Sequence, residues 1–316
     1  MPAPHVTTSR AEQRLADELE DDGVVVRGGP AMAAVVVQEL DYVRRTPQFE
    51  GRHPLYGAMI VSSWTTFDPQ GGVAVELVDA PHDLMEVRPF ADGRASYLVR
   101  TVSGEGVAIA CFEHPLQYEA DLVAMQADIG GVIVQRTPVL GVTRFFQDGQ
   151  VVSWDGRRWN ARSTAASLLP TLLDAAPDLA PAVAHGMLDL AVHWLSPAHV
   201  GATLVVHDGD DASFDTSGAS RPPALTLTNR RHFPPLLSCL VQRDLATIVD
   251  GRGTVTALGV GLLSGAEAAA ISNPRGMRHR SAQRWSFDHP DAVVTVVSED
   301  GPITAYRAGE AVIGPG

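Results

Sequence analysis

Apolar and polar positions in the first 45 residues follow helical and strand-like spacings in turn. In residues 10–22, Leu15 and Leu19 recur at helical spacing among acidic side chains, which predicts a short, solvated helix. The apolar run 24–26 predicts a buried strand directly after it. A second apolar run, residues 32–40, fits either a helix or a strand.

Between residues 57 and 159 the pattern changes to short apolar runs separated by turn residues, which is typical of strands in a mixed or antiparallel sheet. The runs cover residues 58–64, 73–80, 96–102, 106–113, 130–135 and 142–146. Two Asp-Gly pairs, at 148–149 and 155–156, interrupt the apolar residues near the end of this region and predict a hairpin. We therefore predict an α+β domain over residues 1–165.

The second half of the chain alternates helical and strand patterns. Prolines at positions 170, 177 and 181 interrupt a helical segment and predict a linker at residues 166–181. Helices are then predicted at 182–195, 232–242 and 281–285, and strands at 201–206, 246–249, 255–263, 292–298 and 303–306. The alternation predicts an α/β domain at residues 182–316, a mixed β-sheet flanked by helices, preceded by the smaller α+β domain.

Charge and composition exclude several classes of function. The 316 residues carry 24 basic and 37 acidic side chains, a net charge of −13, so a nucleic acid or an anionic membrane is disfavoured as the main partner. No lysine occurs, which excludes the P-loop lysine and Schiff-base chemistry. The two cysteines have no metal-ligand spacing, and no apolar run approaches the ~18 residues of a membrane span. We expect a cytoplasmic protein.

One basic cluster stands out against this acidic background. Residues 273–281 hold four basic side chains and a serine behind a glycine and ahead of a predicted helix. Guanidinium groups and helix N-terminal amides in this arrangement are typical of a phosphate site. The alternative is a solvated, salt-bridged helix start.

Two motifs resemble those of diadenylate cyclase domains, the catalytic modules that join two ATP molecules into cyclic di-AMP. The family is marked by an Asp-Gly-Ala motif and, further along, by a Gly-x-Arg-His-Arg motif that leads into a helix. Residues 276–282, Gly-Met-Arg-His-Arg-Ser-Ala, are similar to the second motif. Residues 244–246, Asp-Leu-Ala, followed by a strand and by Asp-Gly at 250–251, are similar to the first. The order of the flanking elements is also similar, over roughly residues 182–310.

The resemblance implies a function and a set of site residues. It implies that two ATP molecules are condensed into cyclic di-AMP and two pyrophosphates, with Mg²⁺ or Mn²⁺ held by Asp244, at the interface of a homodimer or higher homo-oligomer. The implied catalytic residues are Asp244, Arg278, His279 and Arg280. The implied nucleotide-binding residues are Leu245, Ala246, Gly276, Met277, Ser281 and Glu299.

One position departs from the family pattern. Leu245 stands where the family has glycine, a residue that lets the backbone approach a ligand closely. Its side chain either crowds the ribose or turns into the core beside Ile248. The alternative function is therefore a catalytically degenerate module that binds ATP or a cyclic dinucleotide as a sensor, and a third is a purely structural two-domain protein.

Other candidates carry less chemistry. His185, His193, His199 and His207 are not spaced as metal ligands on one helix face, and neither a Rossmann nor a GxSxG motif occurs. Trp154 and Trp159 are interpreted as packing residues. Residues 1–165 faintly resemble the sensor domains that precede diadenylate cyclase modules, which implies a regulatory role with an unknown ligand.

Overall fold

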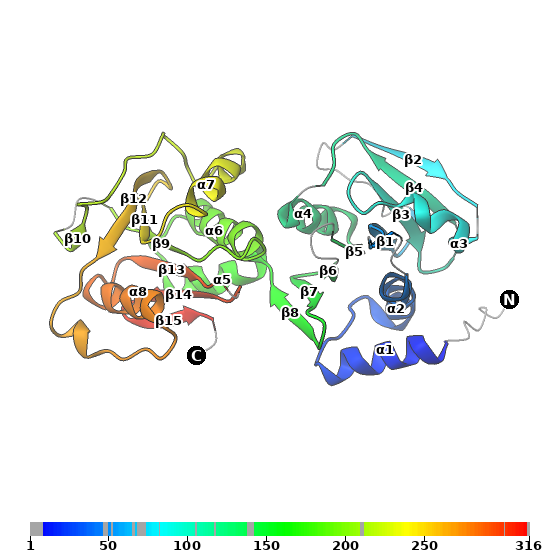
Figure 1. Ribbon diagram of the computed structural model, residues 1–316, viewed down its shortest axis with the longest axis horizontal. Coiled ribbons are helices and arrows are strands. Elements are labelled where there is room, and N and C mark those ends of the chain that lie inside the picture. The colour runs from blue at the N-terminus through cyan, green and yellow to red at the C-terminus, as the bar shows by residue number, and fades with distance from the viewer. Residues whose placement is uncertain are drawn as a thin grey trace. The chain divides into compact units, whose positions relative to one another are not determined.

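The computed structural model describes residues 9–46, 50–51, 53–64, 67, 74–81, 83–104, 106–116, 118–137, 142–208, 212–299 and 301–314. The chain divides into two units, Met1–Ser163 and Thr164–Gly316 (Figure 1). No helix of the described residues is long and apolar enough to cross a membrane.

The first unit is built around a mixed sheet of the order β2-β4-β3-β1-β5-β6-β7-β8, in which only the pair β1–β3 is parallel among the described strands. Its elements are α1 (Arg10–Asp21), α2 (Gly29–Arg45), β1 (Tyr56–Val61), β2 (Val75–Asp79), α3 (Leu84–Val87), η2 (Arg88–Phe90), β3 (Ser96–Thr101), β4 (Val107–Phe112), α4 (Glu119–Ile129), β5 (Val132–Arg136), β6 (Thr143–Gln147), β7 (Gln150–Trp154) and β8 (Trp159–Ser163). This unit spans 163 residues and the second unit 153, so it is not the smaller domain that the sequence predicts.

The two faces of this sheet are covered by different helices. Alternate residues of a strand point to opposite faces. On β1, Ala58 and Ile60 face the core formed with α1 and α2, whereas Met59 and Val61 face the core formed with α4. The apolar run 32–40, left open between helix and strand, is part of α2.

The strand predicted at residues 24–26 is wrong. Val25 is exposed, and a single buried side chain replaces the expected ladder: the Gln147 carboxamide donates to the carbonyl of Val25 and accepts from the amide of Arg27. Gly23, in the left-handed region, turns the chain at the end of α1 before a strand can form.

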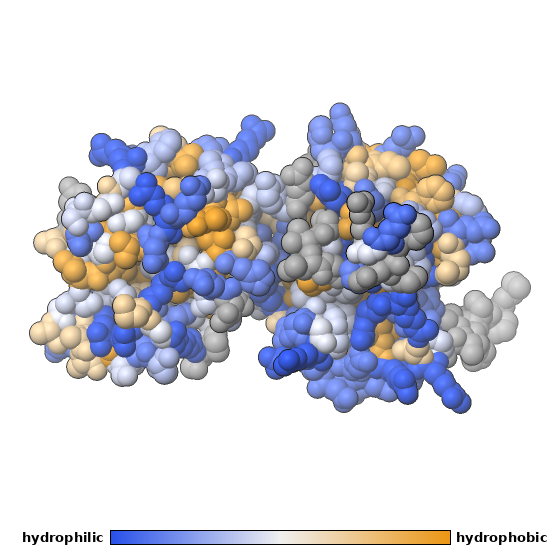
Figure 2. All heavy atoms as spheres, in the orientation of Figure 1, coloured by the Kyte–Doolittle hydropathy of each residue, from blue (hydrophilic) through white to orange (hydrophobic). Residues whose placement is uncertain are grey.

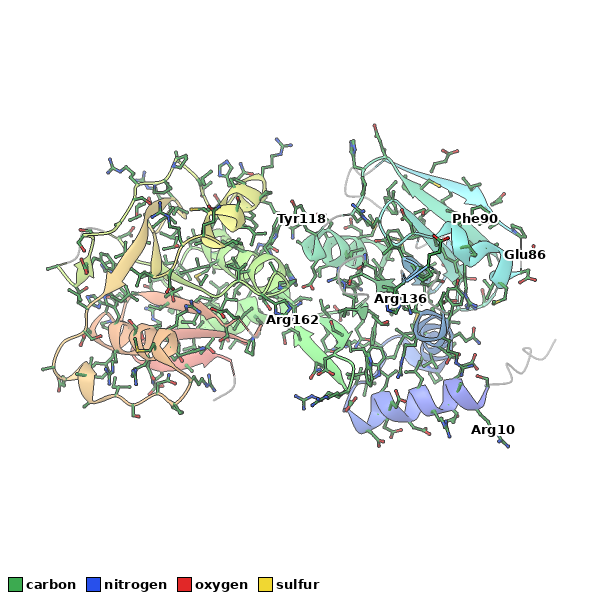
Figure 3. All side chains as sticks on the ribbon, viewed as in Figure 1. Arg10, Glu86, Phe90, Tyr118, Arg136 and Arg162 are labelled. Atoms are coloured by element: carbon green, nitrogen blue, oxygen red, sulfur yellow. The ribbon has the colours of Figure 1, made fainter. Side chains whose placement is uncertain are left out.

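Buried carboxylates fix the helices of the first unit. Glu39 on α2 is fully buried and paired with Arg88 and Arg100. Burial alone would raise the pKa of Glu39, but the two guanidinium groups hold it below its usual value. Glu119, the first residue of α4, is bound by Arg144 and by Arg162. Figure 3 labels Arg162 and Tyr118, the residue that precedes α4.

The second unit repeats the plan with the order β10-β12-β11-β9-β13-β14-β15, and β9–β11 is its parallel pair. Its elements are α5 (Ala165–Ala175), α6 (Pro181–Leu190), η3 (Ala191–Leu195), β9 (Ala202–Val206), β10 (Phe214–Asp215), η4 (Arg230–His232), α7 (Phe233–Leu240), β11 (Ala246–Val249), β12 (Val255–Leu262), η5 (Ala268–Ala270), α8 (Met277–Asp288), β13 (Val293–Val297), β14 (Ile303–Arg307) and β15 (Glu310–Ile313). Helix α8 packs on one face of the sheet, with Trp285 fully buried against Val205 and Val294.

Residues 166–181, predicted as a linker, are part of the second unit. They form most of α5 and the turn before α6, and α5 packs against α6 and β15. Pro170 lies inside α5 instead of ending it, because the buried Ala165 and Leu172 hold the helix against its neighbours.

Apolar surface remains on the first unit. On the face shown in Figure 2, hydrophobic residues gather over β2 and β4. β2 lies at the edge of the sheet, and its Leu77 and Val78 are exposed.

Candidate nucleotide site

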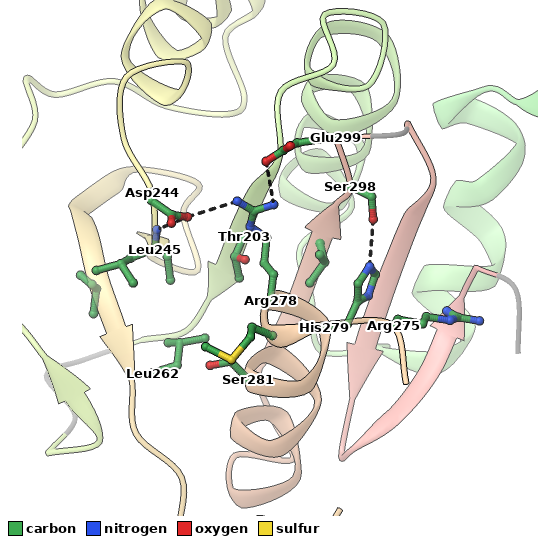
Figure 4. A pocket seen from close by; sticks show the side chains of 14 residues that line it. Thr203, Asp244, Leu245, Leu262, Arg275, Arg278, His279, Ser281, Ser298 and Glu299 are labelled. Atoms are coloured by element: carbon green, nitrogen blue, oxygen red, sulfur yellow. Dashed lines mark hydrogen bonds and ion pairs between the residues drawn. The ribbon is translucent and has the colours of Figure 1, made fainter. Parts of the chain in front are cut away.

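A cavity of about 480 Å³ opens in the second unit, where the start of β11, the start of α8 and the end of β13 meet. Its size lies within the roughly 300–1,000 Å³ range of small-molecule sites. One side is apolar and includes Leu245 and Leu262, and the other is polar and includes Ser298 and His279 (Figure 4).

Asp244 and Leu245 sit at the cavity because the chain turns sharply into β11. Leu245 has a φ of 68°, in the left-handed region that a leucine rarely adopts. This turn aims the Leu245 amide at Asp244 Oδ1, 2.9 Å away. That amide and the Arg278 guanidinium lower the pKa of Asp244.

Leu245 does not pack into the core. It is 57% exposed and lines the cavity, so of the two orientations that the sequence allows, the one beside Ile248 is wrong.

Arg278 is clasped between two carboxylates at the cavity mouth (Figure 4). Its Nη2 lies 3.2 Å from Asp244 Oδ1, and its Nη1 lies 3.8 Å from Glu299 Oε1. Gly201 leaves the room for this guanidinium, because a Cβ there would lie 2.3 Å from Arg278 Nη1. The cation is thus placed in advance where an anionic ligand would meet it.

The start of α8 provides amide donors beside this cation. Gly276 precedes the helix with a φ of 107°, a conformation that favours glycine, and no side chain of the described residues caps the helix. The first amides of α8 therefore have no partner within the helix and carry its positive dipole end. Ser281, one turn further on, lines the cavity as well.

His279 is held by two hydroxyl groups. Its Nδ1 lies 3.1 Å from Tyr306 Oη and its Nε2 lies 2.9 Å from Ser298 Oγ, while the residue is only 6% exposed. Burial, followed by the charges of Arg275 and Arg278, lowers the pKa of His279. Both ring nitrogens thus have hydroxyl partners, and His279 holds the Ser298 hydroxyl at the polar wall of the cavity.

Eight of the ten site residues that the sequence predicts line this cavity: Asp244, Leu245, Ala246, Met277, Arg278, His279, Ser281 and Glu299. Gly276 is adjacent, as the residue before α8. Arg280 does not line the cavity; its guanidinium donates to Met277 Sδ at 3.2 Å. The Asp-Gly turn at 250–251 lies at the other end of β11.

The sequence did not single out several lining residues. Thr203 comes from β9 and Val296 from β13. Both are almost fully buried, and the apolar runs around them in the sequence predict core strands and no ligand site. Val260 and Leu262 extend the apolar wall from β12. Only the sheet order, which brings β9, β11 and β13 together, identifies them.

The residues present fit a divalent metal ion bound together with a nucleotide. Among the described residues, no three His, Cys, Asp or Glu side chains gather as ligands. Mg²⁺ commonly takes one or two carboxylates and completes its shell with water and substrate phosphates. The Asp244 side chain is 78% exposed, and both of its contacts among the described residues use Oδ1, so Oδ2 is left to bind a cation.

Comparison with known proteins gives two family matches. Residues 189–311 match the DAC family, "DisA bacterial checkpoint controller nucleotide-binding". Residues 13–162 match "Probable sensor domain DACNK". No curated protein matches the chain.

Two solved structures are similar to part of the chain. A hypothetical membrane spanning protein from Bacillus cereus is 20% identical, with a TM-score of 0.31, and the match covers 46% of this chain and 85% of that one. A double mutant of DacA from Staphylococcus aureus is 21% identical, with a TM-score of 0.29 and the same two coverages. All residues that line the cavity fall inside the region that matches the DAC family. The chain thus carries a DAC-family domain, preceded by a region that matches the probable sensor domain DACNK.

Proposed function

We propose that the second unit condenses two ATP molecules into cyclic di-AMP and two pyrophosphates. The observation that carries the proposal is the cavity itself, where an exposed carboxylate, a preset guanidinium and the start of α8 converge beside an apolar wall. The carboxylate suits a metal ion, the cationic groups suit a triphosphate, and the apolar wall suits a base.

The reaction needs positioning more than a protein nucleophile. Each 3′-hydroxyl attacks the α-phosphate of the other ATP in line, and pyrophosphate leaves. Arg278 and the first amides of α8 bind the triphosphate and stabilise the charge that develops on it. Mg²⁺ or Mn²⁺ at Asp244 would supply Lewis-acid stabilisation of the phosphate oxygens. His279 holds Ser298 in place at the opposite wall.

The product's symmetry implies a partner. One cavity of this size accommodates one nucleotide, and a ring made from two nucleotides requires two such cavities to face each other. We therefore propose that the active form is a homodimer or higher homo-oligomer.

A second function is favoured by one specific observation. The Leu245 side chain lies in the cavity, next to the proposed metal carboxylate, where the family has no side chain. If it displaces the ribose from in-line geometry, the unit binds ATP or a cyclic dinucleotide without turnover and acts as a sensor.

The test compares two arginines of the same helix in the purified full chain. After incubation with ATP and Mn²⁺, chromatography should detect cyclic di-AMP. Specific activity should rise with protein concentration until all of the protein is dimeric. Arg278→Ala should weaken ATP binding about 10- to 100-fold, the loss of a charge-assisted contact, while Arg280→Ala should change it little.

The outcomes separate the two functions. ATP binding that depends on Arg278 without any product supports the sensor. Unchanged ATP affinity in a folded Arg278→Ala variant contradicts both.

A further inference from the structure

A segment that is buried over residues 191–196 and exposed at residues 198–199 connects the entrance of the second unit with the nucleotide cavity. It consists of residues 191–201, here named the strap: the π-helical turn η3 and the turns that follow it up to Gly201. Every residue of η3 is at most 5% exposed. Single π-helical turns are rare in helices and frequently lie at functional sites.

One end of the strap binds the point where the chain enters the second unit. His193 is 2% exposed, and its Nε2 accepts the amide of Ala165 at 3.1 Å. Ala165 is the first residue of α5 and follows Thr164, the first residue of the second unit. His193 is thus bonded to the chain one residue after the start of the second unit.

The other end of the strap binds the turn between β13 and β14, which carries Ser298, Glu299 and Gly301 and is here named the Glu299 turn. The Ser196 hydroxyl donates to the carbonyl of Gly301 at 2.7 Å. His199 Nδ1 donates to the carbonyl of Glu299 at 3.0 Å. His199 has a φ of 54°, an uncommon backbone conformation outside glycine that costs free energy and points its ring at the turn.

The Glu299 turn contacts two polar residues of the cavity, Arg278 and His279. Glu299 pairs with Arg278, and Ser298 bonds to His279. Gly201, the last residue of the strap, lies against the same pair: a Cβ there would lie 2.3 Å from Arg278 Nη1 and 3.0 Å from Glu299 Cγ. The strap thus fixes the clasp of Arg278 from two sides.

We propose that the strap positions the Glu299 turn against Arg278 and His279, and that it carries displacements of the chain at Thr164 to the nucleotide cavity. Ser196 and His199 are positioning residues, because they act only through backbone carbonyls of the Glu299 turn. The inference rests on the proposed nucleotide function of the cavity. It also gives the sensor domain, which ends just before the Ala165–His193 hydrogen bond, a hydrogen-bonded route to that cavity.

The first experiment breaks the cavity end of the strap in the full chain. His199→Ala removes the donor to Glu299, whereas His199→Asn keeps an N–H at the position of Nδ1 and tolerates the left-handed backbone. Hydrogen exchange of the Glu299 turn, measured without nucleotide, should become about fivefold faster in His199→Ala, the equivalent of one neutral hydrogen bond. His199→Asn should restore the wild-type rate, which a general loss of stability would not explain.

The second experiment breaks the entrance end. His193→Leu fills the buried space without an acceptor, and His193→Gln keeps an acceptor near Nε2. Exchange in the Glu299 turn should become faster in His193→Leu and stay at the wild-type rate in His193→Gln. If His193→Leu does not fold, Thr164→Ala, which removes the cap that accepts the Ser167 amide, loosens the same point.

These results are independent of turnover. Faster exchange confined to the start of α5, with an unchanged Glu299 turn, would overturn the proposal. Faster exchange in the turn with no nucleotide bound by the wild type would support the strap and reject the proposed function. Where nucleotide binds, His199→Ala should also lower ATP affinity several-fold, and equal affinity in the Ala and Asn variants would contradict the positioning role.

Discussion

Replacing Leu245 with glycine tests the most unusual feature of the candidate site. The residue lies in the left-handed region and exposes 57% of its surface in the cavity. Leu245→Gly removes both a side chain next to Asp244 and the steric cost of the backbone conformation. The two effects are separable because Leu245→Ala removes most of the side chain and leaves the backbone cost in place.

Glycine usually makes a protein less stable than alanine at the same position, but at position 245 we expect the opposite order. The left-handed conformation costs an L-residue about 1 to 2 kcal/mol. Glycine recovers this but loses about 0.5 to 1 kcal/mol more backbone entropy on folding. Both variants lose the contacts of the leucine side chain. A fully buried leucine contributes about 1.5 to 3 kcal/mol, so this partly buried one contributes about 1 kcal/mol. The glycine variant should therefore be at least as stable as the alanine variant, and within about 1 kcal/mol of the wild type by the same terms.

The assay combines calorimetry with product formation. For a unit of this size, 1 kcal/mol shifts the melting temperature by roughly 2–4 °C. If the leucine displaces the ribose, both variants should form more cyclic di-AMP than the wild type, because a misplacement of about 1 Å can cost roughly a hundredfold in rate. The reasoning is refuted if the glycine variant melts well below the alanine variant. Such a result would indicate a buried leucine, whose removal costs about 2 to 5 kcal/mol of stability.

Three further predictions follow from the geometry of the cavity. Asp244→Asn should abolish product formation, and titration calorimetry should show that Mn²⁺ no longer changes its ATP affinity. Metal-free ATP binding should persist or rise, because Arg278 loses a competing carboxylate. Retained turnover would exclude Asp244 as the metal ligand. Gly201→Ala should weaken ATP binding, since the added methyl group displaces the Arg278 guanidinium, and an unchanged dissociation constant would contradict the preset cation. The lowered pKa of His279 means that the unfolded chain binds a proton more readily than the folded chain, so the free energy of unfolding should fall as the pH drops below about 6.5. Urea titrations at several pH values should show a smaller fall in His279→Gln. The same dependence of the free energy of unfolding on pH in both proteins would reject this contribution.

Local sequence pattern predicted most strands of both sheets, because their apolar runs and turn residues carry the information. It failed at residues 24–26, where the competing partner, Gln147, is 120 or more residues away and leaves no local signal. It also placed a linker at 166–181, because prolines were read as breaks, whereas α5 tolerates Pro170 once Leu172 is buried. Tertiary burial decided both cases.

The site shows the same division. Motif residues on contiguous segments, such as Asp244 and Arg278, were predicted and lie 3.2 Å apart. The orientation of Leu245 was not predictable, since it depends on a φ angle that glycine would adopt freely and leucine rarely does. Arg280 was included because the motif contains it, whereas in the structure it does not line the cavity.

The clasp of Arg278 implies that metal ion and triphosphate assist each other. In the absence of ligand the guanidinium is attracted to Asp244 and Glu299, and this attraction offsets part of what a phosphate could gain. A cation at Asp244 would weaken the carboxylate's hold on Arg278, and a phosphate at Arg278 would release the carboxylate for the cation. Each ligand thus binds more tightly when the other is present, and linkage makes the two factors equal. Measuring ATP affinity with and without Mn²⁺, and Mn²⁺ affinity with and without ATP, should give the same ratio in the wild type and a ratio near one in Asp244→Asn.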